Sequence, residues 1–564
     1  MNEMTSPVET GPKGEIAHRD LLRHGEQFAP KLRHITDNVW HLVGVRSIAN
    51  CTMIEGETGI ILVDSGSSID DAEAFVEEFR TITDKPIVAV LYTHSHYCRG
   101  ASAYLPKDNP QAVQVWGHEK VDHNYKYGRP EIFPTYVRKI STQMGNHCPD
   151  EGPDAPPNAG LGGEYHTSAG RYGYVSPTHT VSEPMDVTID GVAFRLIPSI
   201  SDTDDCLTIW LPKQRVVIEN IFWRLYPNFG AIRGEFYRKP VLWAQSIEEI
   251  RQLHPEHILG CHGIPYSGEA AIQDMLSDYR DAILYLYDQT VRGINLGLDA
   301  DAMVERIRLP DSLRASPALQ EHYGEFQFGI RGVYNGIMGW YGTDTAQLKP
   351  VPRAVEAERL VTAMGGVETV LADARKWLAE GEAAWAAQLV TYLLRLDPDH
   401  AGYKQLKADA LRHMGQRQRS SITRNYYLTH ARELEGKADT FKVPHRTVGK
   451  VLESDPGTYV ELLRYEVDPA KATGKKGEME LHFGDLDRSF VIDLANSVIR
   501  VTAGGGVANA PRLSMAFGDW AEVIAGDVAL RDLVAGGRAR ITGDRQVVVD
   551  ILSVFDNQRL ELQS

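Results

Sequence analysis

The chain has 564 residues, of which 43% are hydrophobic and 24% charged, and its formal net charge is −17. This length exceeds what one hydrophobic core can organise, so we expect roughly three to four domains. The acidic balance argues against non-specific nucleic-acid binding, which needs a basic surface, and no apolar run approaches the ~20 residues that a membrane span requires.

The first predicted unit, over residues 36–105, alternates strands with a helix. Apolar residues at helical spacing predict a helix from Ile69 to Ile82, and the buried strand before it ends at Asp64. We expect Asp64 to be structural, pinning the loops beside the next strand. In α/β units of this kind the chemistry lies at the carboxyl ends of the strands. The expected strands cover residues 38–44, 51–54, 59–64 and 86–92.

The last of these strands leads directly into the sequence Thr93-His-Ser-His-Tyr-Cys-Arg99. Two histidines at positions i and i+2 after a strand can point into one site if the backbone turns there. We therefore expect His94 and His96 to bind a metal ion. A pair of solvated loop histidines is the alternative.

Farther along the chain, residues 145–183 are rich in Gly and Pro and predict a long loop, either functional or disordered. Strands resume after it, and a helix is expected over residues 241–257. The later expected strands cover residues 185–190, 193–197, 207–211, 216–218 and 257–262.

Acidic and histidine side chains near these strands could complete a metal site. The loop after residue 199 carries three carboxylates, although such a run can also be a solvated turn; they are Asp202, Asp204 and Asp205. Glu219 ends an apolar strand, where a buried carboxylate is costly unless it binds a metal or a partner. His262 ends the last of the short strands.

Two further units follow. Residues 354–436 read as helix throughout, with helices over 367–381, 383–396 and 400–414. They could form a helical-hairpin repeat stack, but we favour an ordinary helical interface domain. The unit from about residue 440 mixes strands and short helices. Its apolar helix faces could bind an apolar ligand or simply form a hydrophobic core. Its expected strands are 478–483, 489–494 and 498–502, and its helices 517–524, 528–535 and 547–555.

The N-terminal segment and the cysteines bear on the cellular compartment. Residues 1–31 are polar and lack the apolar core of a secretory signal, so we expect a cytoplasmic protein. Five cysteines in so long a chain do not suggest a disulfide framework. Free cysteines are usually small buried residues, and we favour this interpretation for Cys98, Cys206 and Cys261.

Taken in order, these motifs resemble those of the alkyl sulfatase family, metallo-β-lactamase-fold enzymes that hydrolyse long-chain alkyl sulfates. The likeness covers almost the whole chain, and although single motifs are weak, their order and spacing are specific. The segments that carry it are residues 93–96, the glycine-rich 160–178, 218–220, 228–234, 261–265, 326–341 and 542–544.

The resemblance implies an α/β fold class and a domain map. It predicts a metallo-β-lactamase αββα sandwich over residues 1–350 and an all-α dimerisation domain over 351–438. An α+β sterol-carrier-protein-like domain would follow over 439–564. A homodimer is implied by the second of these domains.

The resemblance also implies a ligand set. His94 and His96 would bind the first ion, with Asp202 as the best match to the family's glutamate and Asp204 or Asp205 as alternatives. Glu219 would bridge two ions, and His262 would bind the second.

The family's metal strand normally ends in His-x-His-x-Asp-His, and here Cys98 and Arg99 stand at the last two positions. Cys98 could ligate as a thiolate, because a nearby cation lowers the pKa of a thiol. Arg99 cannot ligate, since it has only donors and stays protonated. Its guanidinium could instead stand in for the second cation and grip an oxyanion.

Other residues of the matching segments are expected to hold an anionic group. The planar fork of arginine suits sulfate or phosphate, because it matches two oxygens. We assign substrate binding to Asn228, Arg233, Arg238 and Asn335, and catalytic roles to Arg99, Glu219 and Tyr334.

The sequence thus predicts a metal-dependent hydrolase that acts on a small anionic, sulfate-ester-like organic substrate through a metal-activated water. The site would be mononuclear or otherwise altered, with one or two zinc ions. Iron is the alternative metal, because two histidines and one carboxylate also form the non-haem iron set. A lyase or iron-dependent oxidation on the same scaffold, and a non-catalytic ligand-binding protein, are the competing hypotheses.

Overall fold

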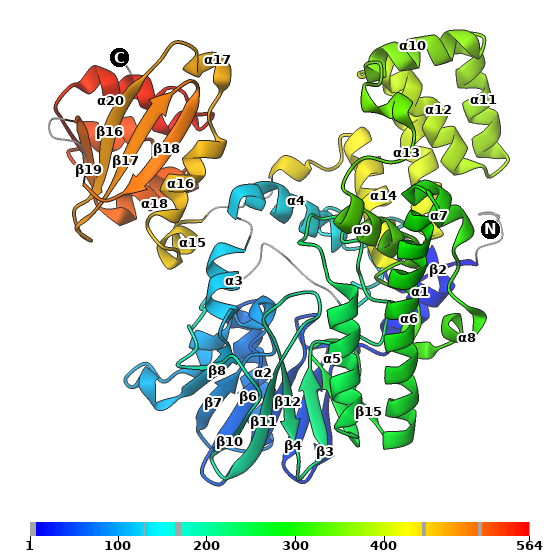
Figure 1. Ribbon diagram of the computed structural model, residues 1–564, viewed down its shortest axis with the longest axis vertical. Coiled ribbons are helices and arrows are strands. Elements are labelled where there is room, and N and C mark those ends of the chain that lie inside the picture. The colour runs from blue at the N-terminus through cyan, green and yellow to red at the C-terminus, as the bar shows by residue number, and fades with distance from the viewer. Residues whose placement is uncertain (1–6, 129, 164–170, 443–446, 506–509, 563–564) are drawn as a thin grey trace. The chain divides into compact units, whose positions relative to one another are not determined.

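The computed structural model describes residues 7–128, 130–163, 171–442, 447–505 and 510–562 (Figure 1). These residues form two compact units. The first comprises Met1–Asp122 and Arg138–Val443, and the second comprises His123–Val137 and Pro444–Ser564.

The first unit contains a seven-stranded sheet in the order β3-β4-β5-β6-β7-β8-β9. Strands β3 to β6 are antiparallel, and β6 to β9 are parallel. The parallel part arises because α2 (Ile69–Phe79) crosses between β6 and β7. The strands are Lys31–Thr36, Val39–Val43, Cys51–Glu55, Ile60–Val63, Ile87–Leu91, Gln114–His118 and His179–Val181.

A six-stranded sheet in the order β10-β11-β12-β13-β14-β15 faces the first (Figure 1). Only β13 and β14 pair in parallel, with α5 (Pro240–Gln252) between them in the chain. The strands are Met185–Ile189, Val192–Ser199, Cys206–Leu211, Val216–Glu219, His257–Gly260 and Tyr266–Ser267.

The two sheets share a core between their inner faces. Val63 and Leu91 of the first sheet belong to the same buried cluster as Ile209 and Ile218 of the second. Neighbouring residues on a strand face opposite sides, so Val217 belongs instead to the cluster with α5 and α6 (Glu269–Asn295). Helices therefore cover the outer face of the second sheet, and the predicted sandwich is confirmed.

The all-α part of the first unit stacks consecutive helices on one another, with small clusters of Ala, Leu and Val between them. Its helices are α10 (Arg353–Ala363), α11 (Val367–Ala379), α12 (Ala383–Leu396), α13 (Ala401–Gln416) and α14 (Ser421–Leu434). All three predicted helices are present. The remaining elements of this unit include β1 (Val8–Thr10), β2 (Ile16–His18), α1 (Arg19–Glu26), α7 (Ala300–Arg306), α8 (Asp311–Arg314) and α9 (Phe326–Met338).

The second unit is an α+β module with a five-stranded sheet in the order β18-β17-β16-β19-β20. Trp520, Phe483 and Phe555 lie in its core, which is built from residues of the C-terminal segment. The strands are Gly477–Phe483, Arg488–Ala495, Val498–Ala503, Arg512–Met515 and Arg540–Thr542, and the longer helices are α18 (Phe517–Ala525), α19 (Leu530–Ala535) and α20 (Arg545–Leu552). Helices α3 (Val121–Tyr127) and α4 (Phe133–Gln143) each have residues in both units.

Three helices end at least three residues earlier than predicted. Two of them, expected over residues 69–82 and 547–555, end at Phe79 and Leu552. The helix expected over residues 241–257 ends at Gln252, because His254 has a positive φ of 51° and Pro255 follows it. The predicted loop over 145–183 has no helix or strand in its described part before β9, and residues 164–170 lie outside the described chain. No helix that the structure describes combines the length and apolarity needed to cross a membrane.

Candidate metal centre

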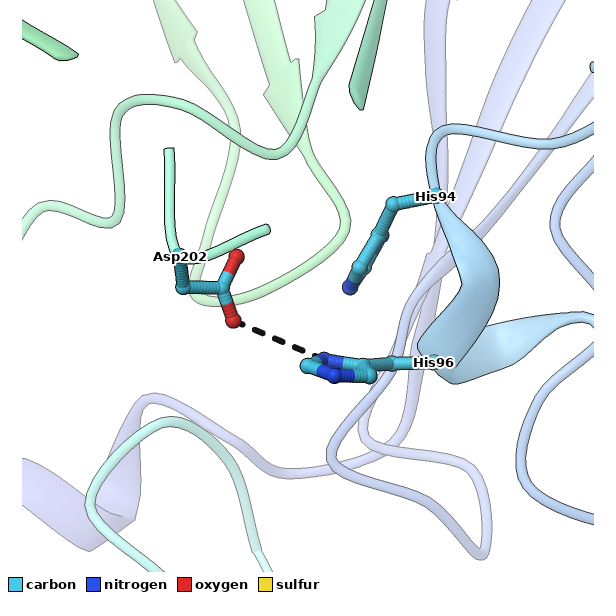
Figure 2. A group of neighbouring side chains, drawn as sticks. All are labelled: His94, His96 and Asp202. Carbon is cyan, nitrogen blue, oxygen red and sulfur yellow. Dashed lines mark ion pairs between the residues drawn. The ribbon is translucent and has the colours of Figure 1, made fainter. Parts of the chain in front are cut away.

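The strand β7 ends at Leu91, and a single 3-10 turn over Ser95–Tyr97 follows it. Asp205 holds this turn, because its Oδ2 accepts a hydrogen bond of 3.2 Å from the Ser95 backbone N–H. His94 lies just before the turn in extended conformation, and His96 lies within it. The turn thus brings two imidazoles toward one space (Figure 2).

Asp202, from the loop after β11, completes a group of three. One donor atom each from His94, His96 and Asp202 lies within 4.8 Å of the other two, and no other such group occurs among the residues that the structure describes. His96 Nδ1 lies 3.5 Å from Asp202 Oδ2 (Figure 2). A buried imidazole, a half-buried imidazole and a carboxylate converging in this way suit a transition-metal ion.

The three acidic residues of this loop, Asp202, Asp204 and Asp205, make different contacts. Asp202 Oδ1 accepts hydrogen bonds from Asn220 Nδ2, at 2.9 Å, and from Ser201 Oγ, at 3.1 Å. These bonds leave Oδ2 facing the histidines. Asp205 binds the histidine turn, and Asp204 is exposed and pairs with Lys120 at 2.8 Å.

His94 is prepared to bind an ion through Nε2. That atom is buried and has no hydrogen-bond partner among the described residues. Its Nδ1 lies 3.0 Å from Thr93 Oγ1, which itself donates to Asp64 Oδ2 at 2.7 Å. Because the Thr93 hydroxyl proton is used on Asp64, the hydroxyl accepts the Nδ1–H, which leaves the Nε2 lone pair facing the site. The hydrogen bond from Thr93 explains the structural role that was predicted for Asp64.

Burial controls the protonation of these groups. It holds the pKa of His94 well below its usual value, with His96 adding to the effect. For Asp202, burial alone would raise the pKa of the carboxyl, but His96, Arg238, His94 and Arg233 together keep that pKa below its usual value. A neutral imidazole and an ionised carboxylate are the forms that bind metal.

Three of the four predicted substrate-binding residues form a buried wall beside Asp202. Arg238 Nη2 lies 3.8 Å from Asp202 Oδ2, and Arg238 Nη1 donates to the backbone oxygen of Asn228. Arg233 pairs with Glu235, its Nε lying 2.7 Å from Oε1, and also donates to Gln143. Arg238 Nε and Asn228 Nδ2 are buried donors without a partner in the described chain.

Glu219, the predicted bridging ligand, is not part of the three-residue group. Its Oε2 accepts hydrogen bonds from the backbone N–H groups of Ile221 and Phe222, and its Oε1 lies 4.0 Å from Arg224 Nη2. Burial raises the pKa of this carboxyl to about 7. Glu219 therefore accepts hydrogen bonds from the backbone that directly follows β13.

His262 lies near the centre but outside the group of three. Its Nδ1 donates to the backbone oxygen of Ile48 at 3.0 Å, and burial lowers its pKa to about 4. The ring of Tyr97 contacts it edge to face, with the ring centroids 5.1 Å apart.

Cys98 and Arg99, the two residues that depart from the family motif, contact other groups than the metal-binding side chains. The Cys98 thiol donates to the Ser95 backbone oxygen at 3.0 Å, and burial raises its pKa well above the usual value, an effect larger than that of Arg99. Cys98 is fully buried, which agrees with the favoured interpretation of it as a small buried residue. The Arg99 guanidinium lies over the ring of Tyr172, 5.9 Å from its centroid. Arg238 and Arg233, not Arg99, are the arginines that lower the pKa of Asp202.

The last two predicted residues lie on α9. The Tyr334 hydroxyl donates to the Tyr341 backbone oxygen at 3.3 Å, and the side chain belongs to the core cluster around α6. Asn335 is exposed, and its backbone oxygen accepts a hydrogen bond from Gly339 at the helix end. The contacts described for these two residues are with their own helix, the segment after it and the core around α6.

Several contributors were missed from the sequence. Asn220 orients Asp202, Thr93 orients His94, and Tyr97 lies among the imidazoles. Asn220 and Thr93 are adjacent to predicted ligands, so their position offered a signal. Of the two partners of Arg233, Glu235 is only two residues away in the sequence, whereas Gln143 is brought near by the fold and has no local sequence signal.

Three family models match the chain and agree with this architecture. The metallo-beta-lactamase superfamily matches residues 44–122, which include β5 to β8 and both histidines of the centre. The two-sheet sandwich with its centre at the strand ends thus defines the chain as a protein of metallo-β-lactamase fold. The alkyl sulfatase dimerisation model matches residues 299–437, and the alkyl sulfatase C-terminal model matches residues 449–561.

Similarity to individual proteins assigns the chain to one family within this fold. The linear primary-alkylsulfatase of Pseudomonas sp. (strain ATCC 19151) is 31% identical over 520 residues, covering 89% of this chain and 98% of the relative. The alkyl/aryl-sulfatase BDS1 of Saccharomyces cerevisiae is 28% identical over 537 residues, covering 93% and 82%. The chain belongs to the alkyl sulfatase family.

A solved structure supports the fold along nearly the full length. The stereoselective inverting sec-alkylsulfatase Pisa1 from Pseudomonas sp. superposes with a TM-score of 0.85 at 24% identity, covering 97% of this chain and 89% of that one. The predicted family, fold class and hydrolase type are confirmed. A redirected lyase or oxidative reaction, and a binding-only protein, are not favoured.

Proposed function

We propose that this chain hydrolyses an organic sulfate ester with the help of one zinc ion held by His94, His96 and Asp202. The observation that carries the proposal is the convergence of their three donor atoms within 4.8 Å. The buried, unpartnered Nε2 of His94 points to a missing electrophile, because buried polar atoms in folded proteins normally have a partner.

The surroundings suit a sulfate group. Arg238 Nε and Asn228 Nδ2 are buried donors that lack an acceptor in the described chain, and they lie on the wall next to Asp202. Oxygens of a sulfate ester would satisfy both donors, and the guanidinium would neutralise the ester's charge. Arg233, held by Glu235 and Gln143, adds a second fixed positive charge.

Each residue then has a defined part in the reaction. A bound zinc ion supplies Lewis acidity, which makes water nucleophilic near neutral pH and withdraws charge from an ester oxygen. Thr93 and Asp64 keep the His94 ring in the binding tautomer and orientation. Arg238 and Asn228 bind and orient the sulfate, and they stabilise the charge that develops as the ester bond breaks.

The names of the relatives suggest the substrate class, linear primary or aryl-bearing sulfate esters. The dimerisation match supports a homodimer, and we retain the three-part division at residues 350 and 438 as a proposal. A cytoplasmic location also remains a prediction from the sequence.

The test combines elemental analysis with sulfate release. Protein purified without added metal is analysed for zinc and iron, and is then assayed on octyl sulfate by ion chromatography of free sulfate. We expect zinc, sulfate release that a chelator abolishes and zinc restores, and at least 100-fold slower release in Asp202→Asn. Zinc-loaded protein that releases no sulfate from octyl sulfate or from 4-nitrophenyl sulfate would contradict the proposal. Iron together with oxygen consumption would favour the oxidative hypothesis.

A further inference from the structure

Gln143 is a buried polar residue that contacts one of the two proposed sulfate-site arginines. It is the last residue of α4, and only 1% of its surface is exposed. Its Oε1 accepts a hydrogen bond from Arg233 Nη1 at 3.3 Å, and its Nε2 donates to the Tyr323 hydroxyl at 2.6 Å. Because a guanidinium has only donors, Oε1 must face Arg233 and Nε2 must face Tyr323. The amide is therefore held at both ends in one orientation.

Glu235 and Gln143 contact different nitrogens of the Arg233 guanidinium. Glu235 Oε1 lies 2.7 Å from Nε and 2.6 Å from Nη2, whereas Gln143 Oε1 accepts from Nη1. Glu235 is only two residues away from Arg233, so this ion pair lies within a single segment of the chain. Gln143 belongs to α4 and ties the guanidinium to a separate element. This tie matters because arginine grips an oxyanion through a rigid planar fork, whose plane must match the oxygens.

Helix α14 holds both Gln143 and Tyr323. The last carbonyls of a helix have no partner within it, and the backbone oxygen of Gln143 accepts a hydrogen bond of 3.0 Å from the fully buried Asn425. Ser420, the N-cap residue of α14, donates through Oγ to the Tyr323 backbone oxygen at 2.8 Å. This helix lies within the residues that match the alkyl sulfatase dimerisation model. A path of hydrogen bonds thus runs from the helical part of the unit to Arg233.

We propose that Gln143 is a positioning residue that fixes the plane of the Arg233 guanidinium for the sulfate group, and that α14 sets the place of Gln143. The helical part of the chain thereby contributes to substrate affinity, although α14 itself supplies no group that binds the ion or the sulfate. This inference rests on the proposed function, since it presupposes that Arg233 faces the sulfate. Loss of such a contact weakens binding of the substrate and of the transition state alike, so KM rises while kcat is kept.

The experiment compares Gln143→Met with the wild type on octyl sulfate, with free sulfate measured by ion chromatography. Methionine keeps nearly the same length and removes both side-chain hydrogen bonds. We expect KM to rise about 10-fold, because a charged group loses a hydrogen bond, while kcat changes by less than about threefold and the zinc content is unchanged. Gln27→Met is the matched control, since Gln27 is a half-buried glutamine that contacts His24 instead of the arginine, and its KM should equal that of the wild type.

A double-mutant cycle separates positioning from a general loss of structure. In an Arg233→Ala background the amide has no guanidinium to orient, so adding Gln143→Met should change kcat/KM by less than about twofold. Tyr323→Phe gives a second measurement if Gln143→Met does not fold, as judged by circular dichroism. It removes the acceptor of Nε2 and leaves Gln143 beside Arg233, and we expect KM to rise by at least about threefold with kcat kept.

The outcomes distinguish this inference from the proposed function. An unchanged KM in both Gln143→Met and Tyr323→Phe, a loss confined to kcat, or an equal loss with and without Arg233 would each overturn the role of Gln143. These results would leave the proposed function intact as long as the wild type binds zinc and releases sulfate. A wild type that releases no sulfate would contradict the proposed function and, with it, the inference that presupposes it.

Discussion

Asp202 has close neighbours at both of its oxygens. His96 Nδ1 lies 3.5 Å from Oδ2 and Arg238 Nη2 lies 3.8 Å from the same atom, while Asn220 and Ser201 hold the other oxygen. The carboxylate is therefore fixed in orientation, and its pKa lies below the usual value although burial alone would raise it. At the scale of single residues, this is the best-prepared ligand of the centre.

Replacing Asp202 by asparagine removes the negative charge at nearly constant shape. We expect the affinity for zinc to fall by at least 100-fold, because one of three protein ligands becomes a weak neutral donor. Competition with a chromophoric chelator measures the change. Asp204→Asn is the matched control on the same loop, since Asp204 is exposed and pairs with Lys120. An equal loss in both variants would argue against Asp202 as the ligand.

Thr93 offers a test of the tautomer argument. Thr93→Val keeps the shape but removes the hydroxyl between Asp64 and His94, so we expect a 10–100-fold loss of zinc affinity. The free energy of unfolding should also fall by roughly 1–3 kcal/mol, since a buried oxygen of Asp64 loses its donor. Thr93→Ser should preserve both values. Unchanged affinity in Thr93→Val would show that the hydroxyl does not orient the ring.

The ligands could be predicted from the sequence only in part. His94 and His96 follow from their spacing after a strand, but the three acids within four residues could be ranked only by the family resemblance, which favours Asp202 over Asp204 and Asp205. The choice depends on which carboxylate faces the other sheet, and that is a property of the folded loop. Arg99 could not be placed either, because a long side chain can point away from a site that its backbone borders.

At the scale of elements, α1 carries His24 against the glycine-rich segment and His322. His24 Nε2 donates to the Gly160 backbone oxygen at 2.7 Å, and the rings of His24 and His322 stack with centroids 4.3 Å apart. Burial lowers the pKa of His24 to about 4 and that of His322 to about 3. Both rings are therefore neutral in the folded protein at neutral pH.

The stability of the first unit should consequently fall in acid. Below pH 6.5 the unfolded chain binds protons at both histidines while the folded chain does not, so the free energy of unfolding decreases as the pH falls from about 6.5 towards 4. Urea unfolding at pH 7.5 and pH 5 measures this difference. His24→Gln should reduce the difference, whereas His254→Gln, at a side chain 63% exposed, should not. Equal pH dependence in all three proteins would contradict the assignment.

Elements with strong periodicity agree with their sequence patterns, as α11 to α13 and β16 to β18 show. The early end of α5 was missed because the helical pattern continues past Gln252, and the positive φ of His254 depends on the strand that follows. Helix α6 was not predicted, although it runs for 27 residues from Glu269 to Asn295. It is amphipathic with many charged residues, and its apolar face is buried because it packs against α5 and the second sheet.

At the scale of the whole molecule, each compact unit has its own hydrophobic core. The core of the second unit contains Trp520 with Phe483 and Phe555, and the proposed metal centre belongs entirely to the first unit. The order of motifs along the sequence was enough to predict the α/β sandwich, the helical part and the final module. The assignment of residues 123–137 to the second unit was not predictable, because nothing in their composition distinguishes them from the helices before and after.

Separate cores predict separate unfolding transitions. Trp520→Ala should destabilise the second unit by about 3–5 kcal/mol, because it leaves a large cavity, and should lower one of two transitions in differential scanning calorimetry. Zinc should raise only the other transition, since a ligand stabilises the unit that binds it. A single transition that responds to both changes would show that the two units unfold together.

The hydrogen bonds and charges around Asp202 and His94 have a consequence for how the enzyme acquires its ion. Contacts within the protein hold both ligands, since Arg238 borders the carboxylate and Thr93 aligns the imidazole. The ligand types and their spacing are therefore set by the fold, and the element that the centre takes up depends on how well a divalent metal suits two nitrogens and one oxygen.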